Sequence, residues 1–139
     1  MHHKSLISIL GAATLAMAGG GFSATASAES WPSEKECKDV KDPSNVIKGW
    51  CAAIDRTKGN CLSCHNLYVT PWPEGFPEAG NIAPTLVKMQ IRFPDKAVLR
   101  AQVWDAAKAN PKTVMPPFGK HKLLSEEEID NVLEFLYSI

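Results

Sequence analysis

The chain has 139 residues, in which 15 Lys and Arg balance 15 Asp and Glu. This length allows one domain at most and excludes a multidomain enzyme. The lack of a basic excess argues against a nucleic-acid partner, because contacts to phosphates supply most of the affinity of such proteins. Hydrophobic residues make up 45% of the sequence but aromatic residues only 8%, which predicts a globular protein with a modest core.

An uncharged apolar run follows Lys4 and ends in small residues at positions 23–28. This pattern predicts a signal peptide that is cleaved after Ala28, so that the exported chain begins at Glu29. An uncleaved membrane anchor is the alternative, but the glycines at 19–21 and the short apolar run disfavour it, and no stable membrane insertion is expected. Removal of residues 1–28 leaves 111 residues with a formal charge of −1. All four cysteines remain: Cys37, Cys51, Cys61 and Cys64.

Short helices are expected before residue 57. Ser33 and Glu36 have the spacing of a helix capping box. Apolar residues then recur at helical spacing after Pro43: Val46, Ile47, Trp50, Cys51 and Ile54. From Tyr68 to Pro84 the chain contains several prolines and glycines, which predict neither a helix nor a regular strand.

Two helices are predicted in the C-terminal half. Asp95 is the expected cap of a helix that runs to Ala109 and ends at Asn110-Pro111. The inner face of this helix is expected to carry Leu99, Val103 and Ala106 or Ala107. Residues 112–123 are expected to form a loop. A second capping box, Ser125 with Glu128, precedes an apolar stripe that must lie against a core: Ile129, Val132, Leu133, Leu136 and Tyr137.

The sequence contains no run of alternating apolar residues, which is the pattern that would predict a sheet. The expected fold class is therefore a small all-α domain with long loops. Residues 29–58 are expected to form an N-terminal extension and residues 59–139 the main domain. A few short helices bury little apolar surface, and a large apolar prosthetic group at the centre would supply the missing core.

Residues 61–65 read Cys-Leu-Ser-Cys-His, the C-x-x-C-H pattern of covalent c-type haem attachment. One helical turn brings the sulfurs of Cys61 and Cys64 to the same side for thioether formation, while His65 presents its imidazole to the iron. A redox dithiol and half a zinc site are the competing interpretations. The first lacks a thioredoxin-like context and the second lacks another ligand pair, so one covalently bound haem c is the favoured cofactor.

The iron needs a second axial ligand opposite His65, or an open position for a small ligand. The candidate ligands are Met89, Met115 and His121. Met115 precedes two prolines that hold the chain extended, so that its thioether can project from the backbone. Met89 lies in an apolar stretch with helical spacing, where methionine is more often a core residue. Met115 is therefore preferred, and thioether ligation would raise the reduction potential relative to a second imidazole.

The other ring nitrogen of His65 needs a partner that fixes the ring. A backbone carbonyl within residues 81–84 is a candidate, although Pro84 is equally consistent with a simple loop residue.

Cys37 and Cys51 remain after the haem takes its pair of cysteines. A disulfide between them is favoured over two free thiols, because an exported chain meets an oxidising compartment.

Four basic residues recur every fourth position: Lys88, Arg92, Lys96 and Arg100. Pro94 interrupts any single helix through them. A solvated face is the favoured explanation, and the alternative is a surface that steers an acidic partner toward the haem edge.

Four segments stand in order along the chain: Gly59-Asn60-Cys61-Leu62-Ser63-Cys64-His65, Gly80-Asn81-Ile82-Ala83-Pro84, Leu99-Arg100-Ala101-Gln102-Val103 and Asn110-Pro111-Lys112-Thr113-Val114-Met115-Pro116. In combination they resemble the SoxX family, the monohaem cytochrome c subunits of the SoxAX complex in bacterial thiosulfate oxidation. The first segment is common to all c-type cytochromes, so the specificity of the resemblance lies in the combination.

The resemblance implies a class I cytochrome c fold in the periplasm, with His65 and Met115 as axial ligands and Pro84 supporting His65. It implies a heterodimer with a SoxA-type subunit, an L-cysteine S-thiosulfotransferase that joins thiosulfate to the SoxYZ carrier protein and releases two electrons. The sulfur chemistry belongs to SoxA, so this chain is expected to have no catalytic residue and to pass electrons to a soluble cytochrome. A general class I cytochrome c carrier without a permanent partner is the alternative.

Overall fold

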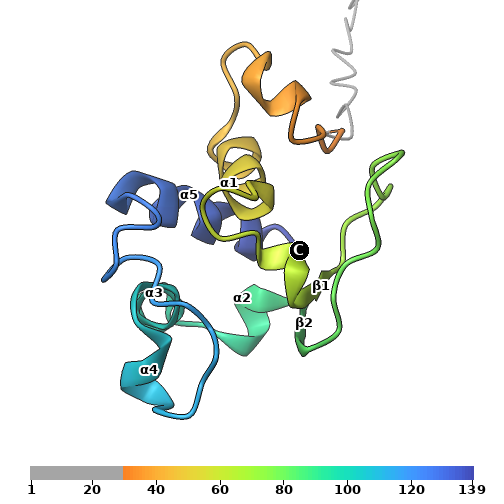
Figure 1. Cartoon of the computed structure of the whole chain (residues 1–139). Helices are drawn as coiled ribbons and strands as arrows, with labels where there is room; N and C mark the ends of the chain where they lie inside the picture. The colour runs from red at the N-terminus through yellow and green to blue at the C-terminus, as the bar shows by residue number, and fades with distance from the viewer. Residues whose placement is uncertain (1–29) are drawn as a thin grey trace, which may run out of the picture.

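The computed structural model describes residues 30–139, so the expected signal peptide lies outside the described residues. The elements follow in the order η1 (Glu36–Lys38), α1 (Asn45–Ile54), η2 (Cys61–Ser63), β1 (His65–Leu67), β2 (Ala83–Leu86), α2 (Met89–Arg92), α3 (Lys96–Trp104), α4 (Ala106–Ala109) and α5 (Glu126–Tyr137) (Figure 1). Among residues 30–139, no helix has the length and apolar composition needed to span a bilayer.

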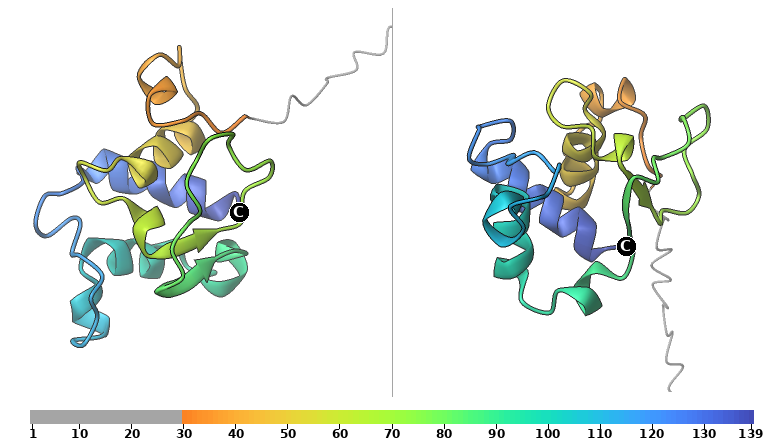
Figure 2. Two further views of the ribbon diagram at one scale, coloured as in Figure 1. Left: turned by 45° about the vertical axis from the view of Figure 1, so that its right-hand side comes forward. Right: turned by 60° about the horizontal axis from the view of Figure 1, so that its bottom comes forward.

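The two longest helices, α1 and α5, pack against each other at the centre of the fold. Helix α1 begins where the Ser44 hydroxyl accepts a hydrogen bond from the Ile47 N–H, as expected of an N-cap. The helices approach so closely at Gly49 that a Cβ there would lie 1.9 Å from the backbone oxygen of Asn131. Only glycine permits this approach. Helix α5 lies between α1 and α3 in both views of Figure 2.

The core around these helices is partly aromatic. Trp50 of α1 is fully buried, and its ring centroid lies 5.5 Å from that of Phe135 on α5. Trp31 covers both rings at 5.3 and 5.5 Å, and Trp50 Nε1 donates to the Pro32 carbonyl at 2.7 Å. Helix α1, which the sequence analysis assigned to an N-terminal extension, therefore lies in the same core as α5.

A disulfide joins Cys37 to Cys51. This is the pairing favoured from the sequence, and it fastens η1 to α1. The capping-box residues Ser33 and Glu36 make their reciprocal bonds here, but the element that begins at Glu36 is a 3-10 turn of only three residues.

The fold contains a small parallel sheet that the sequence analysis did not expect. Strand β1 pairs with β2, with His65 opposite Ala83 and Leu67 opposite Leu86. The strands have three and four residues, which is too short to show an alternating apolar pattern. The irregular segment expected from Tyr68 to Pro84 therefore ends earlier, because β2 begins at Ala83.

The single helix expected from Asp95 to Ala109 is divided in two. Asp95 caps α3 by accepting from the Ala97 N–H, but Asp105 leaves helical geometry with φ −152°. The Trp104 carbonyl instead accepts hydrogen bonds from the N–H groups of Gly119 and Lys120. This contact with the following loop ends α3 one turn early, and Ala106 is the alanine that turns inward.

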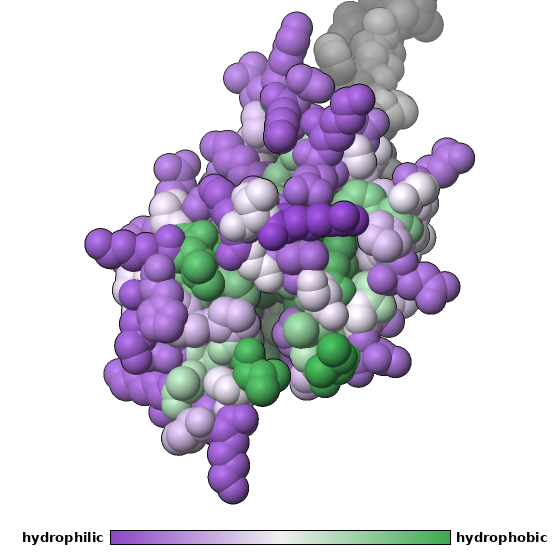
Figure 3. Space-filling view, in the orientation of Figure 1, coloured by the Kyte–Doolittle hydropathy of each residue, from purple (hydrophilic) through white to green (hydrophobic). Residues whose placement is uncertain are grey.

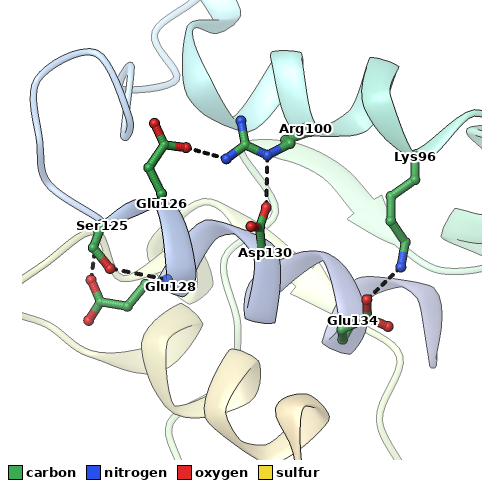
Figure 4. A network of polar contacts seen from close by, with 7 residues as sticks. All are labelled: Lys96, Arg100, Ser125, Glu126, Glu128, Asp130 and Glu134. Carbon is green, nitrogen blue, oxygen red and sulfur yellow. Dashed lines mark hydrogen bonds and ion pairs between the residues drawn. The ribbon is translucent and has the colours of Figure 1, made fainter.

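Ion pairs fasten α3 to α5, as Figure 4 shows. Arg100 pairs with Glu126 and Asp130, and Lys96 pairs with Glu134 at 2.7 Å. Two of the four regularly spaced basic residues therefore bind carboxylates on α5, while Lys88, Arg92 and Lys96 are exposed, as the predicted solvated face requires. Glu126 lies within the capping box of α5, and Asp130 and Glu134 follow it. In this box Ser125 and Glu128 exchange both bonds as predicted.

Candidate haem site

A cavity of about 490 Å³ lies among β1, β2, α3, α5 and the loop after α4. Its wall is mainly apolar and includes Leu99, Val103, Phe135 and Leu136. Figure 3 shows hydrophobic residues on both sides of a narrow hollow on this face. All five residues that the sequence analysis placed at a haem line this one cavity: Cys61, Cys64, His65, Pro84 and Met115.

The two cysteines reach the cavity through the 3-10 turn η2. Asn60 precedes the turn in the left-handed region with φ +35°, and the Cys64 N–H closes the turn on the Cys61 carbonyl at 3.2 Å. The two thiols are not joined to each other. Burial raises the pKa of the Cys61 thiol to about 11, so this thiol is protonated at neutral pH. A redox dithiol needs the opposite shift.

His65 is held by the β1–β2 pairing. The Ala83 N–H donates to the Cys64 carbonyl at 2.9 Å. The carbonyl oxygen of Pro84, the next residue, lies 2.7 Å from Nδ1 of His65. A carbonyl only accepts hydrogen bonds, so Nδ1 is the donor in this bond, and Nε2 is the ring nitrogen that is left for a metal. Pro84 therefore supplies the acceptor that the sequence analysis sought within residues 81–84. The sheet that was not expected is what positions it.

Gly80 packs directly on the cysteine turn. Its N–H donates to the Leu62 carbonyl at 2.7 Å, and a Cβ at this position would lie 2.3 Å from the Ser63 carbonyl oxygen. Real Cβ atoms do not approach backbone so closely. The loop from β1 to β2 can close over the turn only with glycine here.

Met115 lies on the loop after α4. Its N–H donates to the Thr113 hydroxyl at 3.1 Å, and the Thr113 N–H donates to the Asn110 carbonyl at 3.0 Å. The Asn110 side chain also accepts from the Lys112 N–H at 3.1 Å. The sequence analysis used Asn110 as the end of a helix and as part of a motif, and it missed this bonding. The signal was an Asn followed by Pro and Thr, which is typical of a turn closed by side chains.

The other two candidate ligands are placed differently. Met89 lines the cavity but is 2% exposed and packed in the core. Its sulfur accepts a hydrogen bond from Nη1 of Arg92 at 3.4 Å. His121 is exposed and is not among the residues that line the cavity. Met115 is half-buried and lines it. Of the three, Met115 is the one that lines the cavity without being fully packed in the core, so it stays the preferred candidate.

Comparison with known proteins adds no relative: no protein-family model matches the chain, and no curated protein matches it.

Within residues 30–139, no three side chains of His, Cys, Asp or Glu gather as a metal site would require. The zinc interpretation of the cysteine pair therefore has no ligand set in this part of the chain. A haem fits the residues present, because it needs two thiols, one free imidazole nitrogen and an apolar cavity.

Proposed function

We propose that this chain is a monohaem c-type cytochrome that transfers electrons one at a time. One observation carries the proposal: a single apolar cavity is lined by Cys61, Cys64, His65 and Met115, and the ring of His65 is already fixed by the Pro84 carbonyl. Bound haem would supply reversible one-electron chemistry at its iron.

Each residue of the cavity has a definite task in this proposal. The sulfurs of Cys61 and Cys64 hold the group covalently, and Nε2 of His65 ligates the iron. The hydrogen bond from Nδ1 orients the imidazole and increases its basicity. Met115 offers a thioether from the loop after α4, and thioether ligation together with an apolar surrounding would raise the reduction potential. No residue is assigned to substrate chemistry, so the role is electron transfer alone.

The resemblance to the SoxX family supports a more specific proposal. The chain would be the electron-transfer subunit of a periplasmic SoxAX-type L-cysteine S-thiosulfotransferase. Coupling thiosulfate to a cysteine of the SoxYZ carrier releases two electrons, whereas one haem accepts one. The subunit would therefore pass electrons to its soluble acceptor twice for each coupling event, and it needs an acceptor that binds and leaves quickly.

Purification of the native protein tests both levels of the proposal. We expect a coloured protein that elutes as a stable heterodimer with a second c-type cytochrome. A coloured monomer would contradict the SoxX-type role and support a general electron carrier without a permanent partner. A protein without haem would contradict the cytochrome itself. The pyridine haemochrome spectrum distinguishes these outcomes, because it reports the haem independently of any partner.

A further inference from the structure

The segment that carries Met115 leaves the end of α3 and returns to the same place. We call residues 106–118 the Met115 segment; it contains α4 and the loop that turns back toward α3 (Figure 1). At its base, the Trp104 carbonyl accepts hydrogen bonds from the N–H groups of Gly119 and Lys120, both at 3.2 Å. The two ends of the segment therefore meet, and a contact at this base controls whether the segment is closed.

An ion pair joins the two ends. Nζ of Lys120 lies 2.9 Å from Oδ2 of Asp105, and the side chains are 57% and 14% exposed. The other carboxylate oxygen of Asp105 is buried and has no partner of normal hydrogen-bond geometry within residues 30–139. A carboxylate that is mostly shielded from water depends on its cation, so this pair should hold the base more firmly than a fully exposed pair would.

Close packing connects this base to the cysteine turn. A Cβ on Gly119 would lie 2.0 Å from Cε3 of Trp104, so the returning chain touches the indole ring directly. Phe118 is buried, and a Cβ on Gly59 would lie 2.2 Å from Cε1 of Phe118. Gly59 stands just before the cysteine turn, and Phe118 follows Met115 by three residues. A base that opens would therefore shift Phe118 from this contact and displace Met115 with it.

We propose that Asp105 and Lys120 are positioning residues for Met115: their ion pair keeps the Met115 segment closed and so keeps the thioether in place. This inference rests on the proposed function, in which Met115 ligates the haem iron. Without Lys120, the shielded carboxylate has no cation, and the base must open before water can reach it. The rate at which Met115 leaves the iron should therefore depend on this distant pair.

The experiment measures that rate by ligand exchange. Oxidised holoprotein is mixed with excess imidazole, and the loss of the weak red absorption band of the sulfur–iron bond is followed by stopped flow. One sulfur–iron bond breaks and one nitrogen–iron bond forms, with no change of oxidation state. In excess imidazole the departure of Met115 limits the rate. Imidazole is neutral, so removal of a protein charge does not alter its approach.

We expect Lys120→Gln to raise the limiting rate by about tenfold, as for a buried acceptor that loses its partner. Asp105→Asn should raise it by less, because a neutral amide needs no cation. In the Asp105→Asn background, Lys120→Gln should add almost nothing, since the charge that it leaves unpaired is already absent. This order distinguishes the ion pair from a general effect of either substitution.

Lys96→Gln is the matched control. It removes the same charge and breaks the pair with Glu134, which lies at 2.7 Å with both side chains 44% exposed. Neither residue lines the cavity, so the limiting rate should stay as in the wild type. Hydrogen exchange provides a second readout: Lys120→Gln should accelerate exchange of the Met115 N–H, which donates to the Thr113 hydroxyl, but not of the buried amides of α5. A general loss of stability would accelerate both.

Equal limiting rates in Lys120→Gln, Lys96→Gln and the wild type would overturn the inference while leaving the cytochrome intact. If Lys120→Gln does not accumulate, Asp105→Asn decides the question, and a rate equal to that of the wild type counts against the proposal. A haem protein without the sulfur–iron band would contradict ligation by Met115 and this inference with it. A wild type without haem would overturn the proposed function as well, and its spectrum, recorded first, tells these failures apart.

Discussion

The two walls of the cavity are built in different ways. On one wall, the turn at Cys61–Ser63 and the β1–β2 pair fix His65 through backbone bonds and the close packing of Gly80. On the other wall, Met115 stands on a loop that is held mainly by the bonds of Asn110 and Thr113. The first wall is a regular structure next to the attachment cysteines, and the second depends on a few side-chain contacts. In the proposed cytochrome, ligation by His65 should therefore be much harder to lose than ligation by Met115.

The largest effect is expected on the first wall. Replacing both Cys61 and Cys64 by serine removes the thioether sulfurs, so the protein should carry no covalently bound haem. Intact mass measured under denaturing conditions checks this, because covalent haem survives denaturation. Covalent haem in the double variant would show that the attachment site lies elsewhere in the chain.

A substitution on the second wall should leave the haem bound and change the ligation of its iron. Met115→Leu preserves the apolar volume but removes the sulfur, so the weak Met-to-iron absorption band in the red should vanish and the potential should fall. Met89→Leu is the control, and its spectrum should match that of the wild type. A loss of the band in Met89→Leu instead of Met115→Leu would reassign the ligand and overturn the comparison of the two walls.

A change away from both walls should affect stability alone. Neither Cys37 nor Cys51 lines the cavity that we propose for the haem, and their bridge closes a short loop, which stabilises a protein by about 3 kcal/mol. Cys37→Ser should lower the melting temperature of the holoprotein and leave its spectrum unchanged. A thiol assay on the native oxidised protein that titrates Cys37 and Cys51 would contradict the bridge.

A single methyl group should strain the first wall. Gly80→Ala forces the Ser63 carbonyl to move, and overpacking of this kind costs about 1–3 kcal/mol. Gly75 is the comparison, since a Cβ there meets nothing within 4 Å and only its φ of +72° disfavours alanine, at about 0.5–1 kcal/mol. Chemical denaturation should therefore rank Gly80→Ala below Gly75→Ala in stability, and the reverse order would contradict the close packing at Gly80.

The smallest effect is expected at the start of α5. Burial alone would raise the pKa of Glu128, but bonds from Lys58 and Ser125 lower it below its usual 4.5. A lowered pKa stabilises the fold above the unfolded pKa, and this stability is lost as the pH falls through the folded pKa. Glu128→Gln should therefore flatten the loss of stability on acidification below about pH 5, by less than about 1 kcal/mol. An acid slope in Glu128→Gln equal to that of the wild type would contradict this contribution.

The elements that the sequence predicted well are those whose signals are local. The capping box at Ser125 and Glu128 and the cap at Asp95 depend on residues within one turn, and both helices begin where expected. The division of the second helix at Asp105 was missed because its cause is distant: the N–H groups of Gly119 and Lys120 bond to the last turn of α3. Side-chain spacing along one segment carries no information about such a contact.

The same reasoning applies to the cavity. The pattern at residues 61–65 and the prolines after Met115 are local, and the structure places these side chains on one cavity. The choice of the Pro84 carbonyl as partner of His65 required the β1–β2 pairing, which joins residues far apart in the sequence. The contacts of the regularly spaced basic residues were likewise not local: Lys96 and Arg100 bind carboxylates of α5, and Arg92 lines the cavity.

The presence of covalent haem is the central claim, and one measurement tests it most directly. Wild-type protein exported by a bacterium that matures c-type cytochromes should be red and heavier than its polypeptide by the mass of one haem. Its pyridine haemochrome spectrum should show both vinyl groups consumed. Colourless protein with the mass of the polypeptide alone, from cells that mature another cytochrome normally, would contradict the account.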